Sequence, residues 1–352
     1  MNLNTYTRPT VRIGDIETDT YESFTISQPG DNQINNVSIK GLPRELTTYS
    51  LNNQEVVIFL NEGTNDSRAA FRGYVKKAVL SGETVTVTAY DPRILLSGKD
   101  AFPIVIDDNE NFDGHTLVQF IHNYIKTQVN KNSTLIGIDL LRETDPKLLM
   151  RGFRTELAVP YQVMQDSLSQ AIRDSDIENP IDFEFIMIDD GLKSNIVVQE
   201  KKLLTEPASI SFDFLDGIIS LNYEKSPVPN FALVKGNTDI QSKFQYGNMP
   251  EGPSGVTVSG PYDDRDTAKT AGIIEVMRAQ DEYKNISIVC NKGFDVDIGS
   301  IINIYSNQNI TDDSEISGNH RVTSKTITFS KNSCQMQLTL NRKPMKLSQY
   351  IF

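Results

Sequence analysis

The chain has 352 residues, which is long enough for two or three domains. Its composition, 38% hydrophobic and 23% charged residues, is that of a folded protein and argues against intrinsic disorder. The formal net charge of −12, from 34 Lys and Arg residues against 46 Asp and Glu residues, disfavours a nucleic-acid-binding protein, because phosphate groups are held by basic side chains.

The start of the chain and its cysteines indicate a protein in a reducing compartment. Residues 1–10 are polar and lack the basic and apolar segments of a secretory signal. No segment approaches the length of a membrane span, so we expect no membrane insertion. Cys290 and Cys334 lie far apart without a companion pair, and we expect both to be free, buried thiols.

Residues 11–91 have the pattern of short β-strands, because their apolar runs are broken by Gly, Pro and Asn. The clearest hairpin turns near Ser81-Gly82 into a strand at residues 84–90. In that strand two valines and an alanine alternate with threonines, so we expect one of its faces to be buried.

After Pro92 the spacing of apolar residues changes to that of helices. A first helix is predicted from Thr116, where Gln119 completes a capping box. Its apolar stripe consists of Leu117, Phe120, Ile121, Tyr124 and Ile125. A second helix begins at Pro160, and its stripe consists of Tyr161, Met164, Leu168 and Ile172. Two strands follow, at residues 182–188 and 195–199.

Strand patterns return after residue 205. They cover residues 210–214, 218–223 and 231–234, and a stretch rich in Gly and Pro then leads to a helix from about Asp266 to Tyr283.

The last predicted strands lie between Asn285 and Asn341 and end in a second long hairpin. The apolar residues that alternate along its returning strand are Cys334, Met336, Leu338 and Leu340. Both β regions thus end in a long hairpin followed by a proline, Pro92 in the first and Pro344 in the second. This pattern suggests a weak internal repeat and two related barrels.

The predicted fold class is mainly β with α+β insertions, in which two β-barrels are joined by a small α+β domain. The predicted parts are a first β-barrel (residues 1–100), an α+β domain (101–205), a discontinuous second β-barrel (206–237 and 285–344), a loop-rich insertion with one helix (238–284) and a C-terminal tail (345–352).

Four short stretches carry a resemblance to a known family. The first β region contains Phe71-Arg72-Gly73-Tyr74-Val75 and Thr84-Val85-Thr86-Val87-Thr88-Ala89-Tyr90-Asp91. The second contains Asn230-Phe231-Ala232-Leu233-Val234-Lys235-Gly236 and Gly318-Asn319-His320-Arg321-Val322. In their content and their order along the chain, these stretches resemble phage hub proteins of the late control protein D type, to which the T-even baseplate hub is distantly related.

The resemblance implies that the two barrels are tail-tube-like and that the chain forms a homotrimer, a pseudo-sixfold ring between a sixfold tail tube and a threefold central spike. The implied partners are the chain itself, the tail tube protein, the central spike protein and other baseplate proteins. DNA is expected to pass through the lumen without specific binding. The implied location is the tail baseplate of a virion that is assembled in the host cytoplasm.

No stretch predicts a catalytic, cofactor-binding or metal site. His115 and His122 are seven residues apart but lack a third ligand. The acidic stretch 107–114 has Phe112 where a calcium loop requires glycine. A serine elbow, a Walker loop and a dinucleotide fingerprint are all missing from the sequence. We therefore expect no enzyme activity and no cofactor.

The main alternative is a receptor- or carbohydrate-binding tail-tip protein, which is also rich in β-structure. Such a protein usually presents exposed aromatic side chains that stack on sugars, and this chain has no Trp. A cell-wall hydrolase is a weaker alternative, because the sequence shows no catalytic constellation.

Overall fold

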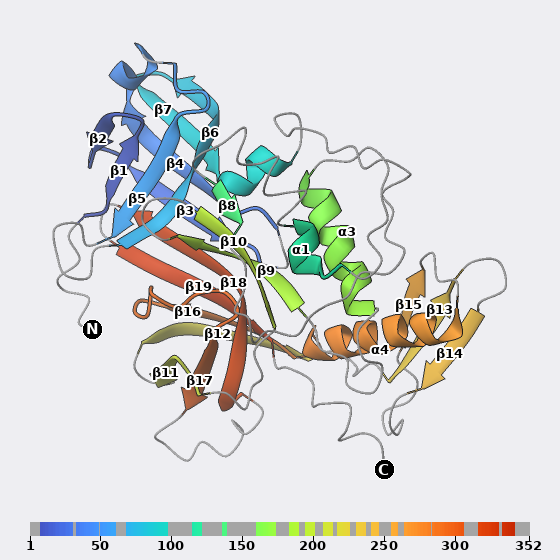
Figure 1. Ribbon diagram of the computed structural model, residues 1–352. Coiled ribbons are helices and arrows are strands. Elements are labelled where there is room, and N and C mark those ends of the chain that lie inside the picture. The colour runs from blue at the N-terminus through green and yellow to red at the C-terminus, as the bar shows by residue number, and fades with distance from the viewer. Residues whose placement is uncertain are drawn as a thin grey trace.

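The computed structural model describes residues 8–30, 33–48, 50–60, 68–97, 115–121, 136–138, 160–173, 183–189, 194–200, 207–213, 217–225, 230–236, 241–245, 255–259, 264–282, 284–305, 316–330 and 333–341. Strands predominate in these ranges (Figure 1), which confirms the mainly β class predicted from the sequence.

Thirteen strands form one large, curled sheet. Those from the first β region are β1 (Thr10–Ile13), β2 (Ile16–Thr18), β3 (Ser23–Gln28), β4 (Asn36–Pro43), β5 (Glu55–Leu60), β6 (Arg68–Ser81) and β7 (Thr84–Tyr90). Those from the later part of the chain are β11 (Ile210–Asp213), β12 (Ile218–Lys225), β16 (Lys284–Cys290), β17 (Ile301–Tyr305), β18 (Gly318–Ser330) and β19 (Ser333–Asn341).

The same arrangement of five strands occurs twice in this sheet. In the first unit the spatial order is β5-β6-β7-β4-β3, and in the second unit it is β17-β18-β19-β16-β12. Taken in chain order, β3 therefore corresponds to β12, β4 to β16, β5 to β17, β6 to β18 and β7 to β19. Every neighbouring pair within each unit is antiparallel. The weak internal repeat predicted from the two hairpins is thus present as a repeated five-strand unit.

The β6–β7 hairpin shows how the sequence builds a unit. Val85, Val87 and Ala89 of β7 are fully buried and alternate with partly exposed residues, as the period of two predicts. Gly82, with φ of +61°, takes the left-handed conformation that the tight turn requires. At Gly73 the β6 backbone lies so close to the carbonyl of Tyr90 that a Cβ atom would clash with it.

The two units are joined edge to edge through the long strand β18. Its first half pairs with β17, and its second half, residues 325–330, pairs with β3 of the first unit. Gly30 follows β3 with φ of +73°, and a Cβ atom there would clash with the backbone carbonyl of Thr323. This junction is therefore a close backbone contact that requires glycine.

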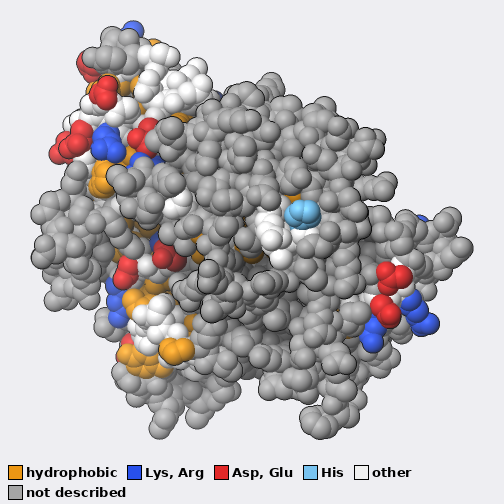
Figure 2. Space-filling view, viewed as in Figure 1, with side chains coloured by type: hydrophobic (Ala, Val, Ile, Leu, Met, Phe, Trp, Pro, Cys, Tyr) orange, Lys and Arg blue, Asp and Glu red, His pale blue; other side chains and the backbone are white. Residues whose placement is uncertain are grey.

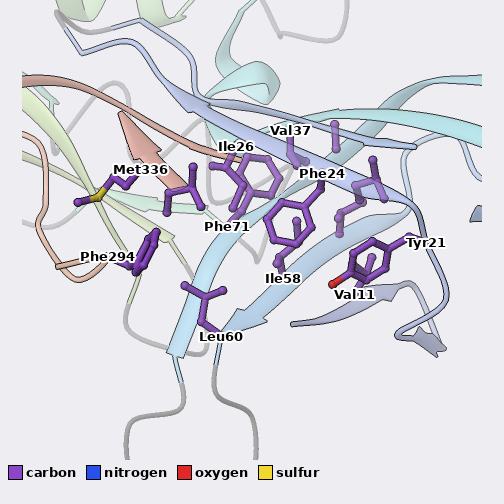
Figure 3. Close-up of a cluster of buried hydrophobic side chains, with 14 of the residues drawn as sticks. Val11, Tyr21, Phe24, Ile26, Val37, Ile58, Leu60, Phe71, Phe294 and Met336 are labelled. Carbon is purple, nitrogen blue, oxygen red and sulfur yellow. The ribbon is translucent and has the colours of Figure 1, made fainter. Parts of the chain in front are cut away.

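One cluster of buried apolar side chains runs through both units. Figure 3 shows Phe24, Ile58 and Phe71 of the first unit in the same cluster as Phe294 and Met336 from the second half of the chain. Because the core is continuous, burial of apolar surface stabilises the two units together.

A smaller α+β part contains a three-stranded sheet, β8 (Ile136–Ile138), β10 (Ser194–Glu200) and β9 (Phe183–Asp189). Its helices are α1 (Leu117–Phe120) and α3 (Pro160–Arg173), and two 3-10 turns, η2 (Arg44–Thr48) and η3 (Pro92–Leu96), belong to the first β region. Helix α3 begins at the predicted proline and packs against α1, β9 and η3.

The predicted capping box and helical stripes agree with the structure where it describes them. The Thr116 amide donates to Gln119 Oε1 at 2.9 Å, and the Gln119 amide donates to Thr116 Oγ1 at 3.2 Å. The stripe residues that are buried are Leu117, Phe120, Ile121, Tyr161, Met164 and Leu168. Tyr124 and Ile125 lie outside the described residues.

A third sheet consists of β13 (Phe231–Lys235), β14 (Gln241–Gln245) and β15 (Gly255–Ser259), and helix α4 (Arg265–Glu282) packs against it. Residues 231–234 are predicted from the sequence to belong to the second β-barrel, but this strand pairs with β14 and β15 instead. Ala232 and Val234 are buried against α4, which explains the pairing. The boundaries between domains stay a prediction.

Candidate assembly surface

The histidines do not form a metal site in the described part of the chain. His115 is half-buried beside the start of α1, and His122 lies outside the described residues. His320 is fully buried, with Nε2 2.6 Å from the carbonyl oxygen of Ile316. Among the described residues, no group of three potential His, Cys, Asp or Glu ligands is close enough to hold a metal ion. The acidic stretch 107–114 is outside the described residues.

Both cysteines are free thiols, as the sequence predicts. Burial raises the pKa of each thiol to about 12. Cys290 is buried and donates to the Met336 carbonyl oxygen at 3.4 Å, whereas Cys334 is half-buried. At neutral pH both stay protonated, so neither has the thiolate character that a nucleophile needs.

A buried ion pair that no sequence pattern indicates links the first unit to helix α3. Asp91 caps η3 by accepting from the Arg93 amide at 2.9 Å, and it also accepts from Arg93 Nη2 at 2.6 Å and from the Asn35 amide at 2.6 Å. Arg93 Nη1 lies 3.4 Å from the Tyr161 hydroxyl of α3.

Both charged groups of this pair are almost fully buried. Burial lowers the pKa of Arg93, but the Asp91 carboxylate and the Tyr161 hydroxyl act together against it, so that the pKa is raised. Burial also raises the pKa of Tyr161, against the opposing effect of Arg93. Since all members are satisfied within the network, its geometry indicates a structural role.

The junction between the two units, where β18 pairs with β3, lies within a single chain and is covered by aromatic side chains. Phe329 of β18 lies opposite Phe24 of β3, and their rings stack with centroids 5.4 Å apart. Tyr21 closes this cluster, with its ring 6.0 Å from that of Phe329 and its hydroxyl donating to the Pro9 carbonyl at 2.7 Å. Burial raises the pKa of Tyr21 to about 12.

The strands that correspond to β18 and β3 in the repeated unit are β6 and β12. Among the described residues, each of these two strands has one edge along which no other strand pairs. The β6 edge consists of residues 77–81, which pair with β7 on one side. The β12 edge consists of residues 218–224, which pair with β16 on one side. No strand in the ranges that the structure describes pairs with the other side of either segment.

The open edges carry exposed apolar side chains. Val79 and Leu80 on the β6 edge are 44% and 48% exposed, and Ile219 on the β12 edge is 52% exposed. Figure 2 shows hydrophobic side chains at the surface in the lower left, where Figure 1 places β11 and β12. Open strand edges with apolar residues pair readily with another chain, so natural proteins usually cover them. In the sequence, the run Ala78-Val79-Leu80, which breaks the alternation of β6, is the signal that could have identified this edge.

None of the helices in the described ranges has the length and apolar character needed to cross a lipid bilayer.

Comparisons with known proteins identify the fold. No family model matches the chain, and neither does any curated protein. Among solved structures, a tail protein from Neisseria meningitidis MC58 is similar, with a TM-score of 0.69 and 13% identity over 98% of this chain and 99% of that one. The 43 kDa tail protein of prophage MuSo2 from Shewanella oneidensis has a TM-score of 0.66 and 10% identity, over 95% of this chain and 96% of that one.

A third similar structure is an E. coli protein described as a component of the type VI secretion system that is structurally similar to the T4 bacteriophage tail proteins gp27 and gp5. Its TM-score is 0.52 with 12% identity, over 95% of this chain and 77% of that one. The chain therefore has the fold of phage tail proteins over nearly its whole length, which agrees with the resemblance seen in the sequence.

Proposed function

We propose that this chain is a structural hub subunit of a phage-type tail baseplate. In this role it forms a homotrimeric, pseudo-sixfold ring that joins a sixfold tail tube to a threefold central spike. The observation that carries the proposal is the five-strand unit that occurs twice in one chain. Three such chains supply six similar units. A ring of six similar units matches a sixfold tail tube on one side, and because it consists of three chains it also matches a threefold spike on the other side.

The partners in this proposal follow from the two symmetries of the ring. They are other copies of the chain, the tail tube protein, the central spike protein and further baseplate proteins. DNA passes through the lumen during ejection without specific binding, and the protein is located in the tail of the virion after assembly in the host cytoplasm.

Two buried polar networks among the described residues support a role in assembly rather than in catalysis. The buried ion pair of Asp91 and Arg93 is satisfied by the Asn35 amide and the Tyr161 hydroxyl. The buried Lys325 ammonium donates to the carbonyl oxygens of Phe294 at 3.0 Å and Val296 at 2.6 Å. Such groups hold a fold together instead of facing a substrate.

The test is the mass of the full-length protein in solution, measured by light scattering with and without spike protein. We expect a trimer, and negative-stain images that show rings. A monomer under both conditions would argue strongly against the hub. Particles shaped as fibres or tips would instead favour a receptor- or carbohydrate-binding protein.

A further inference from the structure

The pairing of β18 with β3 inside one chain is a template for a contact between chains. It joins the fourth strand of the second unit, in chain order, to the first strand of the first unit. The corresponding strands, β6 and β12, have their edges open among the described residues. We propose that the β6 edge of one copy pairs, antiparallel, with the β12 edge of a second copy. This inference deepens the proposed hub function and rests on it.

The equivalent residues of β6 and β18 follow from the two hairpin turns. Ser81 lies opposite Thr84 at the end of the first hairpin, and Ser330 lies opposite Ser333 at the end of the second. Counting back from the turns, Leu80 is equivalent to Phe329, Val79 to Thr328 and Ala78 to Ile327.

The equivalent residues of β12 and β3 follow through the neighbouring strands. Ile26 lies opposite Val37, which lies opposite Ala89 of β7. Leu221 lies opposite Ile288, which lies opposite Leu338 of β19. Ala89 and Leu338 occupy the same place after their turns, so Leu221 is equivalent to Ile26.

These equivalences give the register between the two copies. Within the chain Ile327 lies opposite Ile26, and Thr328 lies opposite Thr25. The template therefore places Ala78 opposite Leu221, Val79 opposite Ser220 and Lys77 opposite Asn222 of the second copy. In that register Glu224 is the diagonal neighbour of Lys77, so that opposite charges are within reach across the pair.

The side chains of the β6 edge also fit this arrangement. Leu80 lies opposite the fully buried Val85, so both face the core side of the sheet. Nevertheless Leu80 is 48% exposed, whereas its counterpart Phe329 is covered by the stacked ring of Phe24. A strand in the place of β3 would cover Leu80, and β12 brings Ile218 and the exposed Ile219 to that position.

Each copy offers both edges, so the contact is heterologous and repeats from copy to copy. A ring forms because the last copy presents a β12 edge to the β6 edge of the first. The pseudo-sixfold ring then alternates β3–β18 contacts within chains and β12–β6 contacts between chains.

The test uses disulfide formation between full-length chains. Residues directly opposite in an antiparallel pair have Cα atoms about 4.5–5.5 Å apart, which is within the range that a disulfide bridges. One tagged chain carries Val79→Cys, a second carries Ser220→Cys, and the two are expressed together and oxidised. We expect a cross-linked species of twice the chain mass, which includes two of the three chains in every ring that contains both variants.

Two controls make the result specific. Thr25→Cys with Thr328→Cys in one chain is the equivalent pair of the internal junction and should form an intrachain disulfide. Val79→Cys expressed with Leu233→Cys, at a similarly exposed position of β13, should give no cross-link.

The outcomes separate this inference from the proposed function. A protein that is trimeric by mass and forms the internal disulfide, but gives no link between positions 79 and 220, would overturn the strand pairing and leave the hub function intact. A protein that is monomeric by mass and gives no link would overturn both. A chain with both Val79→Cys and Ser220→Cys that oxidises to a covalent trimer would support both.

Discussion

At the scale of single residues, the buried ion pair of Asp91 and Arg93 leads to a prediction about stability. Replacing Arg93 with Met leaves the Asp91 carboxylate buried without its counter-ion. We expect the free energy of unfolding in urea to fall by about 3–5 kcal/mol, the usual effect of removing one partner of a buried pair.

The control for this variant is Arg44→Met. Arg44 pairs with Glu83 at 3.5 Å on the surface, where both side chains are mostly exposed. Its replacement should change stability by less than about 1 kcal/mol. Equal losses in the two variants would show that the buried pair has no special role.

The buried thiol of Cys290 gives a prediction about pH. The folded protein raises the pKa of Cys290 to about 12, well above the ordinary thiol value of 9.0. Between these two values the unfolded chain has lost the thiol proton while the folded chain keeps it, so this group makes stability fall as pH rises from about 9 towards 12. Below pH 9 it contributes no pH dependence.

A thiol reagent checks the same assignment. At pH 7.5 we expect Cys290 to react at least tenfold more slowly in the native protein than in urea, because burial suppresses thiolate formation and access of the reagent. Rapid labelling of native Cys290 at this pH would contradict its placement in the core.

At the scale of the elements, strand β19 separates a buried face from an exposed one. Leu338 is fully buried, whereas the adjacent Gln337 is exposed and its amide donates to Ser287 Oγ at 3.1 Å. Leu338→Asp should lower the free energy of unfolding by more than about 4 kcal/mol, because it buries an unpaired charge. Gln337→Asp, one residue away, should leave the melting temperature nearly unchanged. If the two variants had the same melting temperature, the assignment of the buried face of β19 would be wrong.

The sequence predicts most of these elements because their signals are local. Thr116 and Gln119 bond within one helical turn, and the valines of β7 alternate with a period of two. Strands β14 and β15 are missed, because Phe244 is the one large apolar residue of β14 and β15 is a short strand in a stretch rich in glycine and proline.

The partner of each strand is harder to predict than the strand itself. The pattern of β13 predicts a strand but does not show that it joins β14 and β15 instead of the second unit. Likewise Phe24 and Phe329 are far apart in the sequence, and the stacking of their rings depends on the register between two distant strands. The candidate assembly surface therefore becomes visible only when the order of the strands in the sheet is known.

At the scale of the whole molecule, the net charge of −12 leads to a prediction about DNA. Phosphate groups repel carboxylates, and this repulsion is felt within a Debye length of about 8 Å at physiological salt. We expect no measurable affinity for double-stranded DNA at moderate salt. We also expect more Asp and Glu than Lys and Arg along the lumen of the proposed ring.

A gel-shift experiment with micromolar protein checks this prediction. A chain with added Lys residues at exposed positions serves as the control, since it should bind more tightly as salt is lowered. A salt-sensitive complex with the unmodified protein, or a ring with a basic channel, would contradict the proposed passage of DNA.

The pairing of β3 with β18 also determines when the protein can finish folding during its synthesis. Residues 23–28 leave the ribosome long before residues 325–330, with which they pair. At roughly 5–20 residues per second, the interval between them is on the order of tens of seconds. Throughout that interval β3 presents Phe24 and Ile26 on an unpaired edge, so incomplete chains are expected to depend on chaperones until translation reaches β18.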